Sequence, residues 1–219
     1  MLRTAEANPI QRVLIEIYGL SVGLLLFSWG SFLHLFSRIR MRGREHIPVD
    51  TPAIFCCWHG TMILAHNAFY PSYPRKLAGR PMGWMFHPAW IFHGFVRFIQ
   101  LMGVRHVAIG TSGQGGRAAA DELVSLLKSG CSIFLCPDGP MPGPPRQLKK
   151  GALHMALQAG VPIVPLRFTA RGCYRLWWDW DNKYFPLPFC RIDGEIAPPI
   201  RVTEATFAAC AEELQRALG

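Results

Sequence analysis

The sequence predicts a single α/β sandwich domain with a mostly parallel sheet flanked by helices, preceded by an N-terminal membrane-associated helix. Three observations support this prediction. Residues 132–166 contain an apolar run, a helical stretch and a second apolar run, which is the order of a βαβ unit with parallel strands. Strand-like and helix-like segments also alternate upstream of this unit, as they do in α/β proteins. Near the N-terminus, 21 consecutive residues carry no Asp, Glu, Lys or Arg.

This uncharged run lies between Glu16 and Arg38 and is long enough to cross a bilayer, which needs about 20 mostly apolar residues in a helix. Glycine, serine and histidine residues interrupt the run, so the helix could instead lie in the membrane interface. The remaining alternative is a buried core helix with a solvated basic end, and the length of the run disfavours it. We therefore expect residues 1–46 to form a membrane-anchoring segment and residues 47–219 to form the α/β domain.

Four arginines follow the run within seven residues: Arg38, Arg40, Arg42 and Arg44. Near an anionic membrane surface, each such residue contributes about 1 kcal/mol of attraction. Segments rich in Lys and Arg that flank a membrane helix also tend to face the cytoplasm. The predicted location is therefore the inner membrane, single-pass or monotopic, with the α/β domain on the cytoplasmic face.

The composition favours lipid as a partner. The formal net charge is +9, half of the residues are hydrophobic, 17% are charged and the mean hydropathy is +0.17, which is more apolar than most soluble domains. A basic surface suits nucleic acid, anionic lipid or phosphorylated substrates, but no nucleic-acid-binding motif is present. The seven cysteines form no C-x-x-C pair and no metal-ligand spacing. We therefore expect a reducing compartment, with no disulfide, no metal and no bound cofactor.

The elements of the α/β domain are predicted in chain order from their composition and periodicity. Apolar runs predict strands at residues 53–58, 83–86, 104–109, 133–136 and 161–165. Helical patterns occupy residues 61–70, 89–102 and 118–128, part of 151–160, and a final segment that opens at Thr203. Beyond Phe168 the order weakens, with aromatic-rich loops expected at residues 177–181 and 185–189 and an edge strand at residues 191–196.

Two of the predicted strands end in side chains suited to acid–base chemistry. His59 directly follows the run at 53–58, and Asp138 follows the run at 133–136. Ligands of open α/β sheets bind outside the carboxyl ends of the strands. Histidine exchanges a proton near neutral pH, so His59 and Asp138 together provide the groups of an acid–base site. The alternative is that His59 caps a helix and Asp138 closes a turn.

A glycine-rich turn at residues 110–117 invites comparison with a phosphate-binding loop, because helix N-termini favour anions. The turn lacks the Lys-Ser/Thr pair of such loops and the glycine spacing of a dinucleotide-binding motif. Nucleotide binding is therefore disfavoured.

Four short motifs together resemble the lysophospholipid acyltransferase superfamily, in a bacterial branch that carries W-H-G and P-D-G-P. They are Trp-His-Gly at 58–60, Pro-Asp-Gly-Pro at 137–140, Lys-x-Gly at 149–151 and Val-Pro-Ile-Val-Pro at 161–165. The resemblance implies a membrane-associated acyltransferase of phospholipid biosynthesis. Such an enzyme moves a fatty acyl chain from a thioester, either acyl-CoA or acyl carrier protein, to a hydroxyl or amine of a lyso-lipid.

The resemblance also implies roles for individual residues. His59 falls on the catalytic histidine, the general base that deprotonates the acceptor, and Asp138 falls on the acidic residue of a pair that binds the acceptor headgroup. Where most members continue with Thr-Arg, this chain has Pro140 and Met141, so a cation for the headgroup must come from elsewhere. The catalytic candidates are His59 and Asp138, and the substrate-binding candidates are Trp58, Gly60, Gly139, Pro140, Arg146, Lys149 and Arg117.

A second departure from the family concerns the group that orients His59. Most members have an aspartate five residues after the histidine, and Leu64 stands there in this chain. We expect Asp138 or a backbone carbonyl to fix the imidazole instead. The aromatic-rich segment 84–98 is open to two interpretations, an acyl-chain channel or ordinary core. The alternative function is that of a catalytically inactive lipid-binding or scaffolding protein of the same fold.

Overall fold

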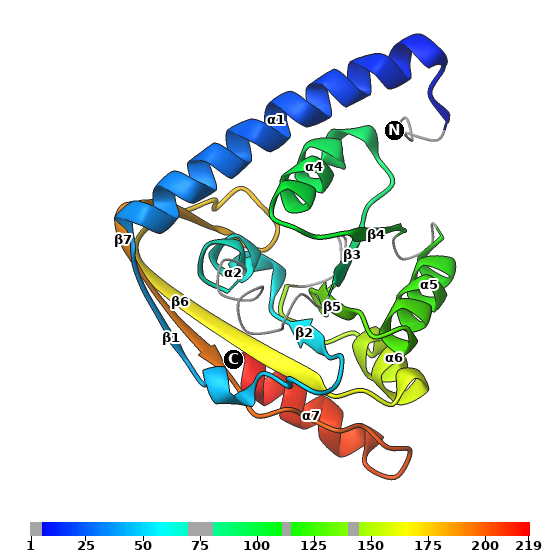
Figure 1. Cartoon of the computed structure of the whole chain (residues 1–219). Coiled ribbons are helices and arrows are strands. Elements are labelled where there is room, and N and C mark those ends of the chain that lie inside the picture. The colour runs from blue at the N-terminus through cyan, green and yellow to red at the C-terminus, as the bar shows by residue number, and fades with distance from the viewer. Residues whose placement is uncertain (1–5, 70–80, 111–114, 140–144) are drawn as a thin grey trace.

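The computed structural model describes residues 6–69, 81–110, 115–139 and 145–219. These residues contain a seven-stranded sheet with the strand order β1-β7-β6-β2-β5-β3-β4 (Figure 1). The strands are β1 (Arg38–Arg42), β2 (Ile54–Cys56), β3 (Met82–Phe86), β4 (His106–Ile109), β5 (Ser132–Leu135), β6 (Ile163–Arg175) and β7 (Tyr184–Ile196).

Five neighbouring strands, β6, β2, β5, β3 and β4, run parallel to one another. β7 is antiparallel to β6, and β1 lies parallel to β7 at the edge of the sheet. The predicted α/β fold with a mostly parallel sheet is therefore confirmed. The N-terminal segment set apart by the sequence contributes not only a helix but also β1, which is part of the sheet.

Helices cover both faces of the sheet (Figure 1). They are α1 (Pro9–Phe36), α2 (Met62–Ala68), α4 (His93–Leu101), α5 (Gly116–Lys128), α6 (Gly151–Ala159) and α7 (Phe207–Leu218), with short 3₁₀ helices η2 (Arg44–His46), η3 (His59–Thr61) and η5 (Trp90–Phe92). Phe55 belongs to the core beneath α2 and α4, whereas its neighbour Ile54 belongs to the core beneath α5, α6 and α7. This alternation is what a strand buried on both faces requires.

The antiparallel part of the sheet differs from the sequence prediction. Residues 185–189, expected as a loop, lie inside β7, and residues 191–196 are not at the edge, because β1 pairs with them. Pro186 and Pro188 explain the error. Both precede the part of β7 that β1 covers, and prolines are tolerated in a strand where no partner needs their missing N–H.

The last helix also begins later than predicted, at Phe207 instead of Thr203. The two threonines that precede it form a turn of their own. The main-chain N of Thr203 donates to the Thr206 hydroxyl (3.1 Å), and the main-chain N of Thr206 donates to the Thr203 hydroxyl (3.2 Å). A main-chain bond from Thr206 N to Thr203 O (3.2 Å) closes this turn, and the helix starts after it.

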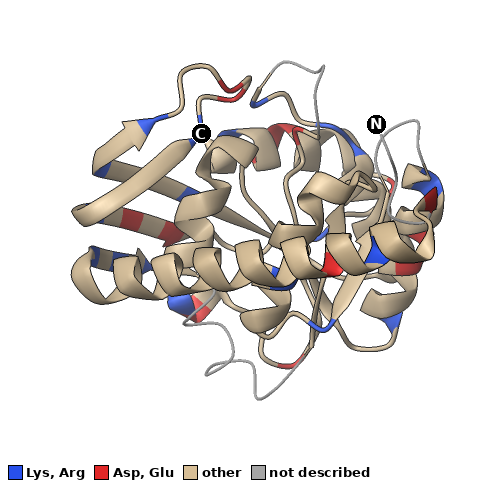
Figure 2. Ribbon diagram, turned by 90° about the horizontal axis from the view of Figure 1, so that it is seen from above, with Lys and Arg blue, Asp and Glu red and all other residues tan. Residues whose placement is uncertain are grey.

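α1 lies along the body of the protein against α4 (Figures 1 and 2). Small residues allow the close approach of the two helices. A Cβ on Gly23 would lie 2.7 Å from the Arg97 Cβ, and a Cβ on Gly94 would lie 2.5 Å from the Val22 Cγ1. The Glu16 carboxylate adds an ionic contact to α4, because it accepts from His93 Nε2 at 3.0 Å and also pairs with Arg97.

The opposite side of α1 is apolar and exposed. Figure 2 shows α1 crossing the body with charged residues only toward its N-terminal end. Among the described residues, α1 is the helix that is long and apolar enough to cross a membrane. Its large exposed apolar side chains are Ile10, Val13, Leu14, Ile17, Leu20, Leu24, Leu25, Phe27, Phe32, Leu35 and Phe36. An exposed apolar stripe of this length marks a site of interaction with lipid or protein.

We predict that Gly23→Ala destabilises the docking of α1, whereas Gly30→Ala does not. The alanine at position 23 would collide with the backbone of α4, at a cost of about 1–3 kcal/mol. A Cβ on Gly30 meets its nearest neighbour, Asn67 Oδ1, at an ordinary 3.7 Å. Thermal unfolding of both variants in one detergent measures the difference, and equal midpoints would contradict the proposed α1–α4 packing.

Candidate active site

The pairing of β2 with β5 decides which residues meet at the carboxyl edge of the sheet. Cys56, the last residue of β2, pairs with Leu135, the last residue of β5. His59 and Asp138 each follow three residues later, so the same register places them opposite each other. A hydrogen bond from Cys57 N to Leu135 O (3.4 Å) continues the pairing beyond the strands. Two groups that are 79 positions apart in the chain therefore become neighbours.

Asp138 is completely buried, and its carboxylate accepts several hydrogen bonds. His59 Nδ1 lies 2.7 Å from Oδ1, and the main-chain N of His59 lies 3.3 Å from both carboxylate oxygens. The main-chain N of Arg146 donates to Oδ2 at 3.4 Å. A buried carboxylate requires such donors in place of water. The His59 side chain remains 24% exposed, so the imidazole lies between the buried anion and solvent.

This contact determines which imidazole nitrogen is available. An Nδ1 that faces a carboxylate carries the proton and donates it, which leaves the Nε2 lone pair free to accept another. Leu64, at the place of the usual orienting aspartate, is fully buried in α2. Asp138 makes the contact that this aspartate would make. Of the two orienting groups expected from the sequence, the structure shows the carboxylate.

Of the three cations expected to bind the acceptor headgroup, Lys149 lies next to the turn that carries Asp138. Gly139 has a φ of +67°, and a Cβ there would lie 2.5 Å from Lys149 Nζ, so the lysine side chain lies against the turn that holds Asp138. Arg146 reaches Asp138 only through its main-chain N–H in the described contacts, and its side chain is exposed. Arg117 is exposed in the first turn of α5, and no described contact joins it to the site.

The other predicted substrate-binding residues have different surroundings. Trp58 is buried, and its indole N–H donates to the main-chain O of Gly219 at 3.0 Å. This hydrogen bond holds the end of α7 against the strand end that carries His59. Gly60 lies in η3, where a Cβ would be 2.7 Å from the main-chain O of Asp181. Only glycine fits this close approach. Pro140 lies outside the described residues.

One wall of the site was missed by the sequence analysis, namely the loop that joins β6 to β7. The Trp180 ring lies 5.6 Å from the His59 imidazole, between ring centroids. The next residue, Asp181, brings its carbonyl to Gly60. The sequence predicts an aromatic loop at residues 177–181, on the surface or at a lipid boundary, and no motif indicates that it returns to a histidine more than a hundred positions earlier.

This loop is held by a partly buried ion cluster. Lys183 Nζ lies 2.9 Å from carboxylate oxygens of both Asp179 and Asp181. Burial raises the pKa of the Asp181 carboxyl, although the nearby Lys183 ammonium opposes this effect. In the sequence, the close spacing of Asp179, Asp181 and Lys183 is the signal that could have indicated a buried turn here.

Two thiols beside the site, those of Cys56 and Cys136, are poor nucleophiles. Burial raises the pKa of both Cys56 and Cys136, and the negative charge of Asp138 raises it further. Because the thiolate is the attacking form of cysteine, these two side chains stay inert near neutral pH. Cysteine–histidine covalent catalysis through them is therefore disfavoured, and the geometry fits histidine acting directly on the acceptor.

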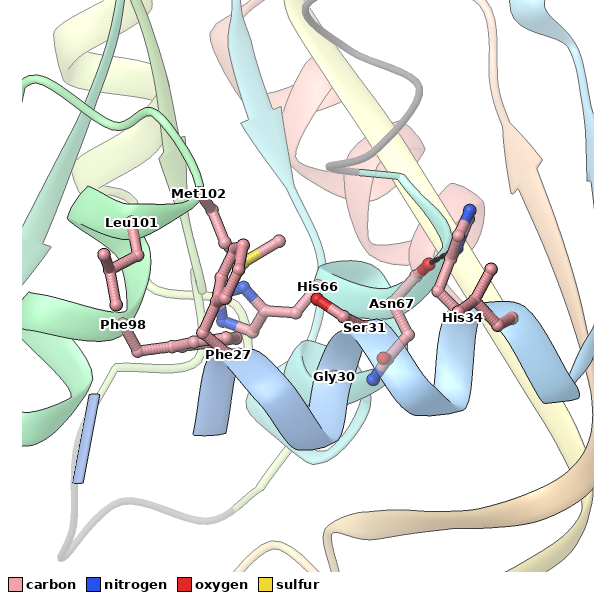
Figure 3. Close-up of a pocket in the computed structure, with 10 residues that line it drawn as sticks. Phe27, Gly30, Ser31, His34, His66, Asn67, Phe98, Leu101 and Met102 are labelled. Atoms are coloured by element: carbon pink, nitrogen blue, oxygen red, sulfur yellow. Dashed lines mark hydrogen bonds between the residues drawn. The ribbon is translucent and has the colours of Figure 1, made fainter. Parts of the chain in front are cut away.

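A cavity of about 440 Å³ lies between α1, α2 and α4 (Figure 3). It is lined by Phe27, Gly30, Ser31, His34, Leu35, His66, Asn67, Phe98, Leu101 and Met102. Burial lowers the pKa of His66 to about 3, so this side chain is neutral and stacks on Trp84 at 4.9 Å. His66 follows His59 by seven residues in a largely helical segment, roughly 10 Å along the helix axis.

A family model for acyltransferases matches residues 38–169, more than half of the chain. The chain belongs to the acyltransferase family. The predicted resemblance to acyltransferases is confirmed at the level of this family. Both His59 and Asp138 lie within the matched region, whereas α1 and the β6–β7 loop lie outside it.

Individual relatives are distant. An uncharacterized protein of Rickettsia prowazekii, RP090, is 22% identical over 82% of this chain and 80% of its own length. The chloroplastic 1-acyl-sn-glycerol-3-phosphate acyltransferase LPAT1 of Arabidopsis thaliana is 26% identical over 66% of this chain, which spans only 40% of the plant protein. The crystal structure of PlsC, the 1-acyl-sn-glycerophosphate acyltransferase of Thermotoga maritima, shares the fold. Its TM-score is 0.54 at 17% identity, over 98% of this chain and 84% of PlsC.

Proposed function

We propose that this acyltransferase moves a fatty acyl chain from an acyl thioester, acyl-CoA or acyl carrier protein, to a hydroxyl or amine of a lyso-lipid at the membrane surface. His59 acts as the general base, and Asp138 orients it. The observation that carries the proposal is the 2.7 Å contact between His59 Nδ1 and a fully buried carboxylate, with the imidazole still partly exposed. This is the arrangement by which an oriented base activates a hydroxyl.

The proposed reaction needs no group beyond those at the strand ends. His59 Nε2 takes the proton of the acceptor hydroxyl, and the oxygen attacks the thioester carbonyl carbon. The carbon–sulfur bond then breaks, and the imidazolium returns the proton to the departing thiolate. The first N–H groups of a helix have no partner within it, so the Gly60 N–H at the start of η3 is the candidate donor to the developing oxyanion.

Lys149 is the proposed contact for the acceptor headgroup. Its ammonium lies against the Asp138–Gly139 turn, within the region where the family binds the headgroup. Two of the similar proteins carry the name of an enzyme that acts on 1-acyl-sn-glycerol-3-phosphate or 1-acyl-sn-glycerophosphate. A lysine beside the base would suit such a phosphate, because its point charge pairs with phosphate oxygens. A phosphate-bearing lyso-lipid is therefore the proposed acceptor.

The cavity between α1, α2 and α4 is the proposed site of an acyl chain. Its lining is mainly apolar, and the one deeply buried histidine is neutral. A fatty acyl chain is long enough to reach from a carbonyl at His59 to the cavity, which begins at the far end of the same helical segment. Of the aromatic residues in segment 84–98, Phe98 lines the cavity, whereas Trp84, Phe86, Phe92 and Phe95 belong to the core or pack against it, so only Phe98 supports an acyl-chain role.

Membrane association is proposed through the exposed face of α1. The other face of α1 packs on α4, and its last turns contact β7 through the stacked rings of Trp29 and Phe185 (6.3 Å). A helix held along its length in this way lies in the interface with its apolar side toward lipid and does not cross alone. We therefore favour a monotopic protein over a single-pass one.

Arginines next to the end of α1 favour an anionic leaflet, and with it the cytoplasmic face of the inner membrane. Arg38, Arg191 and Arg171 pair in one register row across β1, β7 and β6. Arg191 also pairs with Asp193 (Nε–Oδ2 2.8 Å), whereas no described ion pair holds Arg38 or Arg171. Anionic headgroups would pair with these two arginines close to where the apolar stripe of α1 ends.

The function is tested by His59→Ala. Loss of the base should lower the rate of acyl transfer from a long-chain thioester to a lyso-lipid by at least a factor of about a hundred. Co-sedimentation with vesicles should not change, because α1 is untouched. The matched control is His154→Ala, an exposed histidine on α6. A wild-type protein that binds vesicles but transfers no acyl group to any lyso-lipid would instead support the inactive lipid-binding alternative.

The acyl-chain site is tested by Gly30→Leu. Position 30 lines the cavity, and a leucine there would fill part of it. We expect the preferred acyl chain of the donor to become shorter by several carbons, because a smaller cavity holds fewer methylenes. Gly30→Ala is the control, since its added methyl group meets no close contact. An unchanged chain-length profile in Gly30→Leu, with full activity, would contradict this assignment and leave the role of His59 intact.

A further inference from the structure

The loop between β6 and β7, residues 176–183, has an inner and an outer side. The inner side belongs to the active site. Trp180 lies 5.6 Å from the His59 ring, and the carbonyl of Asp181 fills the space that a side chain at Gly60 would need. A displacement of this loop would therefore move a wall of the site.

The polar groups of the loop are satisfied within it. Lys183 bridges Asp179 and Asp181 at 2.9 Å each, and the main-chain N of Leu176 donates to the Lys183 carbonyl at 2.9 Å. Residues 176–183 contain one lysine and two aspartates, a formal charge of −1, and all three charged groups meet at the inner end. The outer end, Trp177 and Trp178, carries no charged side chain.

The outer side consists of two exposed tryptophans. Trp177 is 72% exposed and Trp178 is 63% exposed, and their rings meet edge to face at 5.6 Å. The Tyr174 ring, at the end of β6, lies 5.8 Å from that of Trp178 and is also exposed. Tryptophan combines a large apolar ring with one N–H donor and is enriched at the headgroup level of membranes. Two adjacent exposed tryptophans therefore suit a bilayer interface better than water.

This aromatic end is continuous with the helix that we assign to the membrane surface. Tyr174 pairs with Phe185 across β6 and β7, and the Phe185 ring stacks on Trp29 of α1 at 6.3 Å. A path of aromatic side chains thus runs from α1 to Trp178, and the loop continues from there to His59. The loop therefore lies next to His59 on one side and joins the aromatic side chains that lead to α1 on the other.

We infer that the tip of the β6–β7 hairpin is a second membrane-docking element, which inserts Trp177 and Trp178 into the interface at the mouth of the active site. The occupant is the headgroup–acyl boundary of a phospholipid bilayer. An acidic carrier protein fits less well, because the loop has a formal charge of −1 and its lysine is already held by two aspartates, while Arg175 at its base is bound to Tyr184. The inference rests on the proposed function, since docking here would bring the site wall formed by Trp180 and Asp181 to a lyso-lipid that is still in the bilayer.

The test compares the full-length double variant Trp177→Ser/Trp178→Ser with Val49→Ser. Val49 is 57% exposed and lies before β2, at the opposite edge of the sheet from the strand ends that carry the site. The vesicles are pure phosphatidylcholine, so that arginine–headgroup attraction contributes little. We expect the double variant to raise the KM for a lyso-lipid presented in these vesicles by about tenfold. The kcat for a short-chain, water-soluble acceptor and thioester should stay unchanged.

A second variant and a measurement independent of activity keep the inference falsifiable. Trp177→Phe/Trp178→Phe retains apolar rings and should keep the wild-type KM on vesicles, but it should lose the part of the tryptophan fluorescence that brominated phosphatidylcholine quenches. Equal quenching in wild type and the Phe variant would overturn the inference. A double Ser variant that loses activity equally on soluble and vesicle substrates would also overturn it. If the wild type transfers no acyl group, the quenching difference still decides whether the tip docks.

Discussion

The site depends on one hydrogen bond, from His59 Nδ1 to the buried carboxylate of Asp138, and that bond depends on the register of two short strands. β2 and β5 end opposite each other, and each functional side chain is on the third residue after its strand. Burial of Asp138 is tolerated because imidazole and backbone donors replace water around it. Of the simpler alternative, the turn at Asp138 is present, but His59 is the first residue of η3 and not its cap, because Trp58 is the N-cap. The register brings the start of η3 and this turn together, and the proposed chemistry depends on that proximity.

The parts that we propose to contact lipid are α1, the cavity beside it and the β6–β7 loop. α1 offers an apolar stripe outward and packs inward through Gly23 and Gly94, where larger side chains would separate it from α4. The same close packing forms the cavity next to α2, whose helical segment begins at His59. The β6–β7 loop completes the arrangement by covering His59 with Trp180. One short segment, from η3 through α2, thus connects His59 with the proposed acyl-chain site.

Much of the fold was predictable, because buried parallel strands are apolar runs and their ends carry the motifs. The pairing of His59 with Asp138 followed from the same reasoning, once both were placed at strand ends. Long-range contacts were not predictable. Pro186 and Pro188 disguised a strand whose register no local pattern reveals, and the approach of Trp180 to His59 depends on how the β6–β7 hairpin folds back. Of the three candidate cations, only the structure could distinguish Lys149, because its position depends on the absence of a side chain at Gly139.

The central claim is tested most directly by nitrogen-15 NMR of the histidine side chains, with the His59 signals assigned by their absence in His59→Ala. If Asp138 orients the imidazole, neutral His59 carries its proton on Nδ1, and the Asp138→Asn variant shifts this tautomer preference. The account predicts a protonated Nδ1 and an unprotonated Nε2 in the folded wild-type protein. A neutral His59 with its proton on Nε2, or a tautomer that is unaffected by Asp138→Asn in a folded variant, would contradict it.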